Sequence, residues 1–535
     1  MFFFRKALRC IVRVRRLVKV MKKKRWFISS NLDASLSHGF FAQKVFELMH
    51  HKGHQVAGYL GQHSCQHIPE FSQAQYVPSE LGYSESQLIQ AIQSISSGMD
   101  VNLVNEVVND VEIYKSFLRC SNRSMSFPRD ISFRDRIFYL SVEFWICFVK
   151  VNQIDACFFY RIPHFAFDSL LANIAIKLGI SIYYLDRTDF KRLYFVRRDW
   201  NTTDVLLSEK NASYLDASLA TESGWKEISK EMNNASVDHN SNMDKSFFYR
   251  ISNYFQTTKS TFRSIIEWFT PSNFYKLDGA VYLTPFSKYL IPALIIYRSW
   301  QSRALWSNYK KHTANFKLPT TFLFFPLHVQ PEQSTDPAAG KYANLEYTIR
   351  MIARTLPLDW KLVIKEHPRQ FDDRIIGVRK ITGRDINFYK RLSEDPNILF
   401  APLELDSKYL INKSMGCLVI NGSVGYEALR LGKSVGCFGT PWYLSLRETY
   451  LVRCDESLSN FINRLFEEGI GYINSPLTKE ELVESIKQYC FSAPSNFSHD
   501  SFDFYEKSLL EKDARVLCHA LDHDISARFQ ADNNK

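Results

Sequence analysis

The sequence predicts an α/β protein with two doubly wound, Rossmann-like domains that face a cleft, an arrangement like that of GT-B proteins. The chain has 535 residues, which is more than one hydrophobic core usually organises. With 45% apolar and 23% charged residues, it has the composition of a globular protein. Short apolar runs alternate with helical patterns in both halves, which is typical of parallel strands covered by helices on both faces.

Basic residues are concentrated at the start of the chain. The segment MFFFRKALRCIVRVRRLVKVMKKKR, residues 1–25, holds eleven Lys and Arg and no acid, and subtracting these from 67 leaves 56 basic residues against 56 acidic ones. On a helix, its apolar side chains lie on one side and most of its arginines on the other, which predicts a helix lying on an anionic membrane surface. Arginines interrupt the apolar run too often for a spanning helix or a signal peptide. A solvated basic arm or a nucleic-acid tail is the alternative.

The first domain is expected over residues 26–270. It opens as strand, helix and strand, and the same pattern returns later with Gly179 as the helix stop. The segments are RWFISS, GFFAQKVFELMHHKG, HQVAGYL, DACFFY, PHFAFDSLLANIAIKLG and ISIYYLD. Residues 62–154 contain helical stretches that the pattern does not order. The Ser- and Asn-rich composition of residues 201–275 indicates a boundary or a mobile insertion.

The second domain is expected over residues 271–490, followed by a helical tail over residues 491–535. From Pro319 onward, short apolar runs alternate regularly with helices, as in a parallel sheet. The segments are TTFLFFPL, YANLEYTIRMIARTL, KLVIKEHP, NILFAPL, SKYLINKS, GCLVING, SVGYEALRLG and KSVGCFG.

Polar residues follow several of these strands at the edge where doubly wound sheets bind ligands. The strand KLVIK ends at Pro368, which denies helix to the residue before it. The residues that we expect at this edge are His328, Gln330, Glu332, Ser334, Lys365, Glu366 and His367.

The loop NGS after the strand GCLVI adds Asn421, Gly422 and Ser423 to the same edge. Free N–H groups at the start of the next helix favour a phosphate or carboxylate, and Gly422 permits close approach. Glu427 shares a helix face with Ser423 and is placed to hold ribose hydroxyls. The alternative is that Ser423 only caps its helix. LGKS lacks the glycine that a P-loop requires, and no G-x-G-x-x-G follows a strand.

In the first domain, candidate residues follow the predicted strands and should face the cleft between the domains. A histidine beside a proline is more often structural, but His164 follows a predicted strand, which makes a cleft-facing position about as frequent, so both interpretations of His164 stay open. The candidates are Arg161, His164 and Asp168; Asp33, Ser35 and His38; and Asp186, Arg187 and Asp189.

FPLHVQPEQST, KEHP and NGSVGYEALRLGKSVGCFG, in that order, resemble the capsule polysaccharide biosynthesis family, whose better understood members are Kdo transferases with a GT-B-like fold. The resemblance covers about residues 319–443. It implies a nucleotide-sugar donor, CMP-Kdo, bound mainly by the second domain, with His367 on the donor phosphate. Gln330 and Glu332 match the Gln-Pro-Glu motif near the donor sugar, while Ser423 and Glu427 would hold the nucleotide. Lys365, Asn421 and Gly422 complete the expected donor site.

The expected function is therefore a glycosyltransferase of bacterial capsule or other surface polysaccharide synthesis. Glycosyl transfer needs a stabilised leaving phosphate and a carboxylate that acts as base or nucleophile. Asp168 and Glu332 are the candidate carboxylates and His164 a further catalytic candidate, so retention and inversion both stay open. A nucleotide-sugar epimerase of the same fold, or a non-catalytic glycan-binding or export accessory protein, is the alternative.

The expected partners are the nucleotide-sugar, a lipid-linked or growing glycan, and the inner face of the bacterial inner membrane, to which residues 1–25 would bind the cytoplasmic protein peripherally. No nucleic acid, metal or cofactor is expected. The ten cysteines form no C-x-x-C pair, so we expect reduced, mostly buried thiols.

Overall fold

The structure is a computed structural model, and it describes the greater part of the chain. The described residues are 24–29, 37–61, 68–78, 81–82, 84–95, 100–124, 131–190, 193–198, 205, 287–330, 332–335, 337–371, 383–468, 476–478, 481–482, 485, 490–493 and 507–532. The predicted membrane-surface helix therefore lies outside the described residues, except for Lys24 and Arg25. Nearly all of the Ser- and Asn-rich segment lies outside them as well.

A seven-stranded sheet forms the centre of the first domain. Its strands are β1 (Arg25–Ser29), β2 (Gln55–Gly61), β3 (Gln75–Pro78), β4 (Ala156–Phe159), β5 (Ser181–Arg187), β6 (Leu193–Arg197) and β13 (Cys490–Ser492). They are ordered β13-β6-β5-β4-β1-β2-β3. The strands from β3 to β5 run parallel, whereas β6 and β13 are antiparallel to their neighbours. Both faces are covered, which explains why the central strands read as continuous apolar runs.

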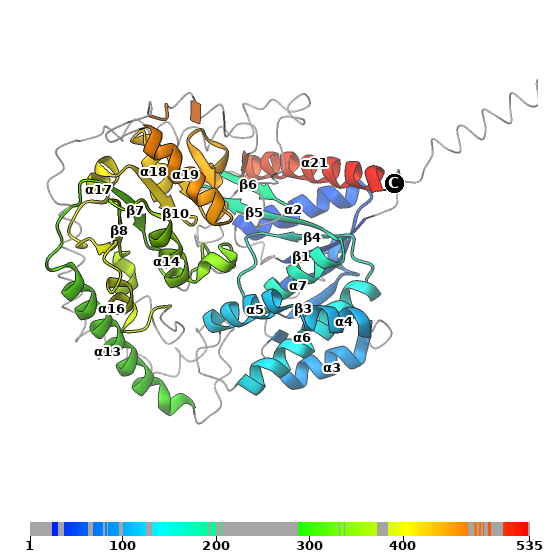
Figure 1. Ribbon diagram of the computed structural model, residues 1–535. Helices are drawn as coiled ribbons and strands as arrows, with labels where there is room; N and C mark the ends of the chain where they lie inside the picture. The colour runs from blue at the N-terminus through cyan, green and yellow to red at the C-terminus, as the bar shows by residue number, and fades with distance from the viewer. Residues whose placement is uncertain are drawn as a thin grey trace, which may run out of the picture.

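Helices cover both faces of this sheet (Figure 1). They are α2 (Ser37–His51), α3 (Glu85–Ile95), α4 (Val101–Val108), α5 (Val111–Ser124), α6 (Ile131–Val151), α7 (Ala166–Lys177) and α21 (Lys507–Asp532), with a short 3-10 helix at Pro69–Phe71. Core residues of α3 to α7 pack on one face, and those of α2 and α21 pack on the other. Gly179, the predicted helix stop, has a φ of +67°, a conformation that glycine adopts at low cost.

A six-stranded parallel sheet forms the centre of the second domain. Its strands are β7 (Phe322–Pro326), β8 (Lys361–Lys365), β9 (Ile398–Phe400), β10 (Gly416–Val419), β11 (Val435–Cys437) and β12 (Thr449–Leu451). Their order is β12-β11-β10-β7-β8-β9. The carboxyl ends of β7, β8 and β10 are therefore neighbours, because β7 pairs with both of the other strands.

The helices of the second domain also lie on both sides of its sheet. They are α13 (Ser287–Thr313), α14 (Leu345–Thr355), α16 (Phe388–Ser393), α17 (Ser407–Lys413), α18 (Val424–Arg430) and α19 (Asp455–Glu468), with 3-10 helices at Gly340–Ala343, Pro368–Phe371 and Trp442–Ser445. The α/β fold of two doubly wound domains is thus confirmed. Among the helices that the structure describes, none is long and apolar enough to cross a membrane.

The end of the chain returns to the first domain. β13 pairs with β6, and α21 packs along α2 (Figure 1). Tyr183 of β5 donates a hydrogen bond to Asp524 of α21 at 2.8 Å. Asp522 pairs with Lys52 at 2.8 Å and with His54 at 3.0 Å. The domain boundaries expected from the sequence stay predictions, but residues 490–493 and 507–532 complete the first sheet and its core.

Candidate functional site

Hydrogen bonds join the loops after β7 and β10 at the carboxyl edge of the second sheet. The backbone N–H of Asn421 donates to His328 Nε2 at 3.3 Å, and Asn421 Nδ2 donates to the carbonyl of Ser334 at 2.8 Å. The Ser334 hydroxyl in turn donates to Glu332 Oε2 at 3.2 Å. The structure therefore brings these four residues into one network at the edge where the sequence places them, while their roles stay predictions.

Two glycines allow this network to pack. A Cβ added to Gly422 would lie 2.9 Å from His328 Nε2, and one added to Gly439 would lie 2.2 Å from Asn421 Oδ1. Real Cβ contacts of this length do not occur, so both positions need glycine for side-chain packing. Close approach of a ligand to Gly422 stays a prediction.

Ser423 stands at the start of α18 but does not cap it. Its side chain is exposed and makes no capping hydrogen bond. The alternative that Ser423 serves only as a cap therefore loses its physical basis. The seven-residue α18 is short, so we place less weight on its dipole than on the side chains around it.

The charge cluster at the end of β8 contains a buried ion pair. Glu366 and Arg384 are both fully buried and lie 2.8 Å apart. The Tyr389 hydroxyl donates to Glu366 Oε2 at 2.7 Å, and the His367 N–H donates to Oε1 at 2.8 Å. Burial raises the pKa of Glu366, and the charge of Arg384 opposes that shift. Glu366 thus organises the loop, with Arg384 as a partner that the sequence pattern did not identify.

The two histidines of this edge differ in environment. His367 Nδ1 accepts a hydrogen bond from the Arg369 N–H at 3.1 Å, so the proton of the neutral ring lies on Nε2. Burial lowers the pKa of His328 to about 3, and the charges of His367 and Arg384 add to the shift. His328 is therefore a neutral imidazole over the whole physiological pH range.

Gln330 is buried and bonded within its own domain. Its Nε2 donates to the Ala343 carbonyl at 2.7 Å, and its backbone N–H donates to Gln370 Oε1 at 2.8 Å. These bonds position the loop that carries Glu332. A direct role of Gln330 in donor binding stays a prediction.

Lys365 and Glu427 face a second charge cluster. Lys365 Nζ donates to the Ser407 hydroxyl at 3.0 Å. Burial lowers the pKa of Lys365 to about 8, while nearby carboxylates, including Glu427, act in the opposite direction. Burial also raises the pKa of Glu427; Lys408 opposes the shift and Asp189, from the first domain, adds to it. The cluster therefore includes residues of both domains.

The two domains contact each other beside this cluster. The indole N–H of Trp442 donates to Asp189 Oδ2 at 3.0 Å. The ring of Phe190 lies 5.5 Å from that of Trp442 and 5.7 Å from that of Tyr426. The contact brings the loop after β5, which the sequence predicted to face the cleft, against the second domain.

Asp186 and Arg197 make a second link between the domains. Asp186 pairs with Arg197 at 2.9 Å, and Arg197 also donates to the carbonyl of Thr440. Burial raises the pKa of Asp186, and Arg197 opposes the shift. These contacts favour a structural role for Asp186, whereas Arg187 beside it is exposed.

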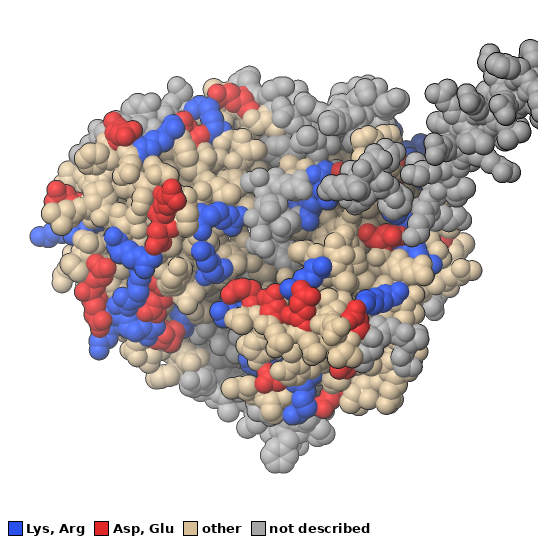
Figure 2. Space-filling view, turned by 45° about the vertical axis from the view of Figure 1, so that its right-hand side comes forward, with Lys and Arg blue, Asp and Glu red and all other residues tan. Residues whose placement is uncertain are grey.

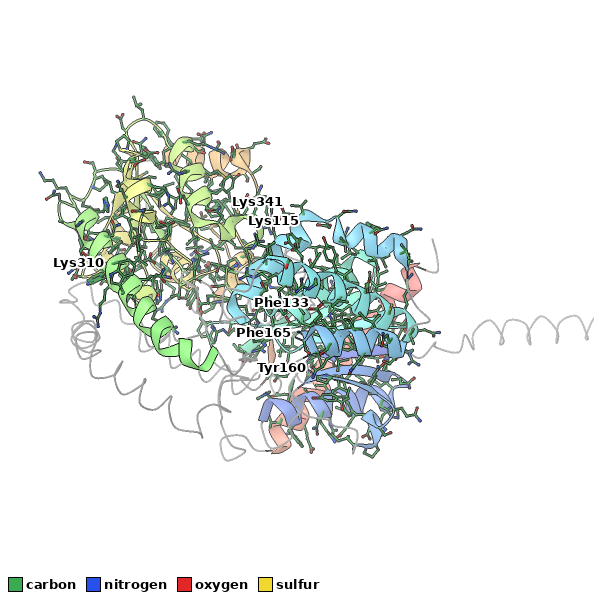
Figure 3. The ribbon with its side chains drawn as sticks, turned by 90° about the horizontal axis from the view of Figure 1, so that it is seen from below. Lys115, Phe133, Tyr160, Phe165, Lys310 and Lys341 are labelled. Carbon is green, nitrogen blue, oxygen red and sulfur yellow. The ribbon has the colours of Figure 1, made fainter. Side chains whose placement is uncertain are left out.

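His164 and Asp168 both bond within the turn that begins α7. His164 Nδ1 lies 2.9 Å from the Ile162 carbonyl, and Asp168 Oδ1 accepts from the Phe165 N–H at 2.9 Å. Figure 3 labels Phe165 in this turn, and the Arg161 guanidinium lies over its ring at 5.0 Å. These contacts show how the turn is held, and the catalytic roles of His164 and Asp168 stay predictions.

Of the other first-domain candidates, the structure describes His38, which lies in the first turn of α2. His38 is buried, with its ring 5.9 Å from that of Tyr160. Asp33 and Ser35 lie outside the described residues. Within the described part of the chain, no group of three His, Cys, Asp or Glu could hold a metal ion, and the cysteines are free, all but Cys454 being buried.

The fold and this edge define a two-domain α/β protein with its candidate ligand site at the carboxyl ends of parallel strands, next to the first domain. A model of the family described as "Capsule polysaccharide biosynthesis protein" matches residues 250–446, which contain all three sequence motifs. The predicted resemblance to this family is thus confirmed for residues 250–446.

Solved structures similar to this chain include two of KpsC and one of an epimerase. KpsC of Thermosulfurimonas dismutans matches as a β-Kdo 2,7 transferase (16% identity, TM-score 0.22, 38% of this chain and 57% of that chain). It also matches as a β-Kdo 2,4 transferase (14% identity, TM-score 0.25, 58% of this chain and 78% of that chain). UDP-GlcNAc 2-epimerase of Methanocaldococcus jannaschii matches at 11% identity (TM-score 0.24, 86% of this chain and 98% of that chain). At these TM-scores the structures carry no argument about activity. No curated protein matches the sequence.

Proposed function

We propose that the protein is a glycosyltransferase of capsule or other surface polysaccharide synthesis that binds a nucleotide-sugar donor at the carboxyl edge of its second sheet. The observation that carries the proposal is the network of Glu332, Ser334, Asn421 and His328, which joins the ends of two neighbouring strands. In doubly wound sheets, ligands bind at this edge. The match of residues 250–446 to the capsule polysaccharide biosynthesis family supports the polysaccharide context.

The side chains at this edge suit the departure of a nucleotide. A leaving phosphate gains negative charge, and His367 and Lys365 are the groups that would stabilise it. Glu427 would hold the ribose hydroxyls. A carboxylate, Glu332 or Asp168, would deprotonate the acceptor hydroxyl or attack the anomeric carbon.

The finer part of the proposal is that the donor is CMP-Kdo and the acceptor a lipid-linked or growing glycan. The three motifs shared with the family support this donor. Residues 1–25 support a peripheral position at the inner face of the inner membrane, because a basic amphipathic helix binds anionic lipid surfaces. Outside that segment basic and acidic residues balance, and Figure 2 shows both signs interspersed on the face in view.

The test is a calorimetric titration of the full-length protein with CMP, CDP, UDP and GDP in parallel. Binding of CMP alone supports the CMP-Kdo donor, whereas preference for UDP or GDP replaces it with a nucleotide-diphosphate sugar. Failure of all four to bind overturns the proposal. His367→Ala and Glu427→Ala should weaken binding, while His523→Ala, an exposed histidine of α21, should not.

Incubation with the preferred donor separates the transferase from an epimerase. A transferase leaves the donor sugar unchanged in the absence of acceptor, apart from slow hydrolysis. Conversion of the donor into its epimer without any acceptor would replace the transferase proposal with the epimerase.

A further inference from the structure

Arg384 connects two strand ends of the candidate site. Its Nη2 donates to the carbonyl of His328, after β7, at 2.7 Å. The same guanidinium pairs with Glu366, after β8, at 2.8 Å. Both side chains of the ion pair are fully buried. The planar Arg384 guanidinium therefore sets the position of the loop after β7 relative to the loop after β8, because it contacts an acceptor in each. The guanidinium also lies over the Phe388 ring, with Cζ 5.6 Å from the ring centroid.

The side chain of His328 is held in one protonation state and one tautomer. Asn421 donates its N–H to Nε2, so the proton of the neutral ring lies on Nδ1. The charged groups that act on this ring are His367, from the loop after β8, and Arg384, from the segment before α16. Both disfavour a second proton, and burial acts in the same direction.

An unmet hydrogen bond is a second sign that this histidine serves a ligand. His328 Nδ1 and Arg384 Nη1 are buried and have no hydrogen-bond partner within the described part of the chain, and Arg384 Nε, which lies 2.8 Å from Glu366 Oε2, forms an ion pair there without hydrogen-bond geometry. A buried donor without an acceptor costs free energy, so such atoms are uncommon in folded proteins. His328 Nδ1 and Arg384 Nη1 both lie beside the candidate phosphate site. Their lack of an acceptor is expected if the ligand, or a water molecule that the ligand orders, supplies one.

We propose that Arg384 is a positioning residue of the donor site: by binding the His328 carbonyl and the Glu366 carboxylate together, it holds the His328 backbone in place, so that the neutral ring, whose tautomer Asn421 sets, presents its Nδ1–H to the bound donor. This inference rests on the proposed function for the identity of the ligand. The protonation state and tautomer that we expect for His328 do not depend on the proposed function. Lysine cannot replace arginine here, because a single ammonium lacks the planar fork that reaches both acceptors.

The experiment uses two variants and a matched control in the full-length protein. Arg384→Lys keeps the charge and removes the fork. The double variant Glu366→Gln/Arg384→Gln removes both charges together, so that neither is left buried alone. The control is Arg354→Lys, because Arg354 pairs with Asp455 at 2.7 Å in the same domain with more than half of both side chains exposed.

Nitrogen-15 NMR of labelled histidine reads the state of His328 directly, with His328→Gln to assign its signals. In the wild type we expect a neutral ring with the proton on Nδ1 between about pH 5 and 8, the range over which an ordinary histidine titrates. In the double variant we expect His328 to titrate at higher pH than in the wild type, and in Arg384→Lys we expect a shifted Nδ1 signal. The control should leave the signals unchanged.

Calorimetry with the nucleotide that binds the wild type gives the second readout. We expect affinity to fall about tenfold or more in both Arg384 variants, and not in the control, as for loss of a hydrogen bond to a charged group. If Arg384 only stabilises the fold, its variants will have a lower melting temperature, but below that temperature the His328 signals and the nucleotide affinity will not change. That result would overturn the inference. A protonated or Nε2–H His328 in the wild type would also overturn it, even if the double variant does not fold.

The two proposals fail separately. If the wild type binds no nucleotide but His328 responds to Arg384 as expected, the positioning role stands and the donor assignment falls. If nucleotide binds and the His328 signals ignore both Arg384 variants, the donor site stands and the positioning role falls.

Discussion

Trp442→Phe removes one hydrogen bond between the two domains and keeps much of the packing. The indole N–H donates to Asp189 Oδ2 at 3.0 Å, whereas the ring contact with Phe190, at 5.5 Å between centroids, is one that phenylalanine can also make. A hydrogen bond to a charged group contributes about 1.5–3 kcal/mol. Because Asp189 is exposed and solvent screens its charge, we take the lower end of this range and expect the free energy of unfolding to fall by about 1.5 kcal/mol at a pH where Asp189 is ionised.

The size of this loss should depend on pH in a defined direction. Although much of the residue is exposed, the contact with the second domain desolvates the Asp189 carboxylate and raises its pKa, and the Trp442 indole opposes that shift. An acid whose folded pKa lies above its unfolded value binds more protons when folded, so its contribution to stability falls as pH rises through that interval. Without the indole the folded pKa rises further. The penalty of Trp442→Phe is therefore largest above the folded pKa and shrinks as pH falls toward about 4, the unfolded value.

Urea unfolding followed by circular dichroism, at about pH 8 and pH 5, measures this difference. Asp189→Asn is the matched background, because its side chain can still accept the indole hydrogen bond but carries no charge. In that background, we expect Trp442→Phe to cost on the order of 1 kcal/mol at both pH values. An equal penalty at both pH values and in both backgrounds would refute the reasoning.

Three further expectations concern the second domain and the start of the chain. Affinity for an anionic nucleotide should decline as pH rises through about 8, because Lys365, whose pKa burial lowers to about 8, loses its charge. Calorimetry of Lys365→Arg should show no such decline; a decline of equal size would contradict the role of Lys365. Gly439→Ala should lower the free energy of unfolding by about 1–3 kcal/mol, because its Cβ would lie 2.2 Å from Asn421 Oδ1. Thermal unfolding would measure this, and an unchanged midpoint would show that Asn421 can move at no cost. Deleting residues 1–23 should abolish sedimentation with anionic vesicles and leave nucleotide affinity unchanged; retained vesicle binding would exclude the segment as the anchor.

Strands β7 to β11 of the second domain could be predicted from the sequence because each is a short apolar run followed by a helix or a turn, whereas β12, whose three residues are only partly buried, was not predicted. The helices of residues 62–154 could not be ordered, and α6 shows why. Its buried residues extend over almost its whole length from Ile137 onward, so no polar face marks the helical period. β13 is three residues long and joins the sheet through β6, far away in sequence. Pairing of this kind depends on the tertiary fold and leaves no local pattern.

The candidate site also contains residues that the sequence could place and residues that it could not. Residues after β7, β8 and β10 could be placed at one edge, because the carboxyl ends of parallel strands meet there. Arg384 could not, because an arginine in a polar stretch looks the same whether it is solvated or buried against Glu366. The link from Asp189 to Trp442 depends on how the two domains meet, which neither sequence segment encodes alone.

The structure distinguishes the two candidate catalytic carboxylates by the bonds that each already makes. Asp168 is buried and accepts the Phe165 N–H at 2.9 Å at the start of α7, so Asp168→Asn keeps this hydrogen bond but makes it a weaker, uncharged one, and it removes the carboxylate along with any catalytic role. Glu332 is partly exposed and accepts only a hydroxyl, that of Ser334, at 3.2 Å among its described side-chain bonds. A base or nucleophile must reach the substrate, which favours Glu332.

We therefore expect Glu332→Gln to abolish sugar transfer while nucleotide affinity and the unfolding midpoint stay unchanged, since the amide oxygen can still accept from Ser334. Transfer assays and calorimetry on the same preparations check this outcome. Asp168→Asn is the comparison, and we expect it to lower the unfolding midpoint with a smaller loss of transfer. The reverse pattern, with transfer retained in Glu332→Gln and lost in Asp168→Asn beyond what its stability explains, would assign the carboxylate to the first domain.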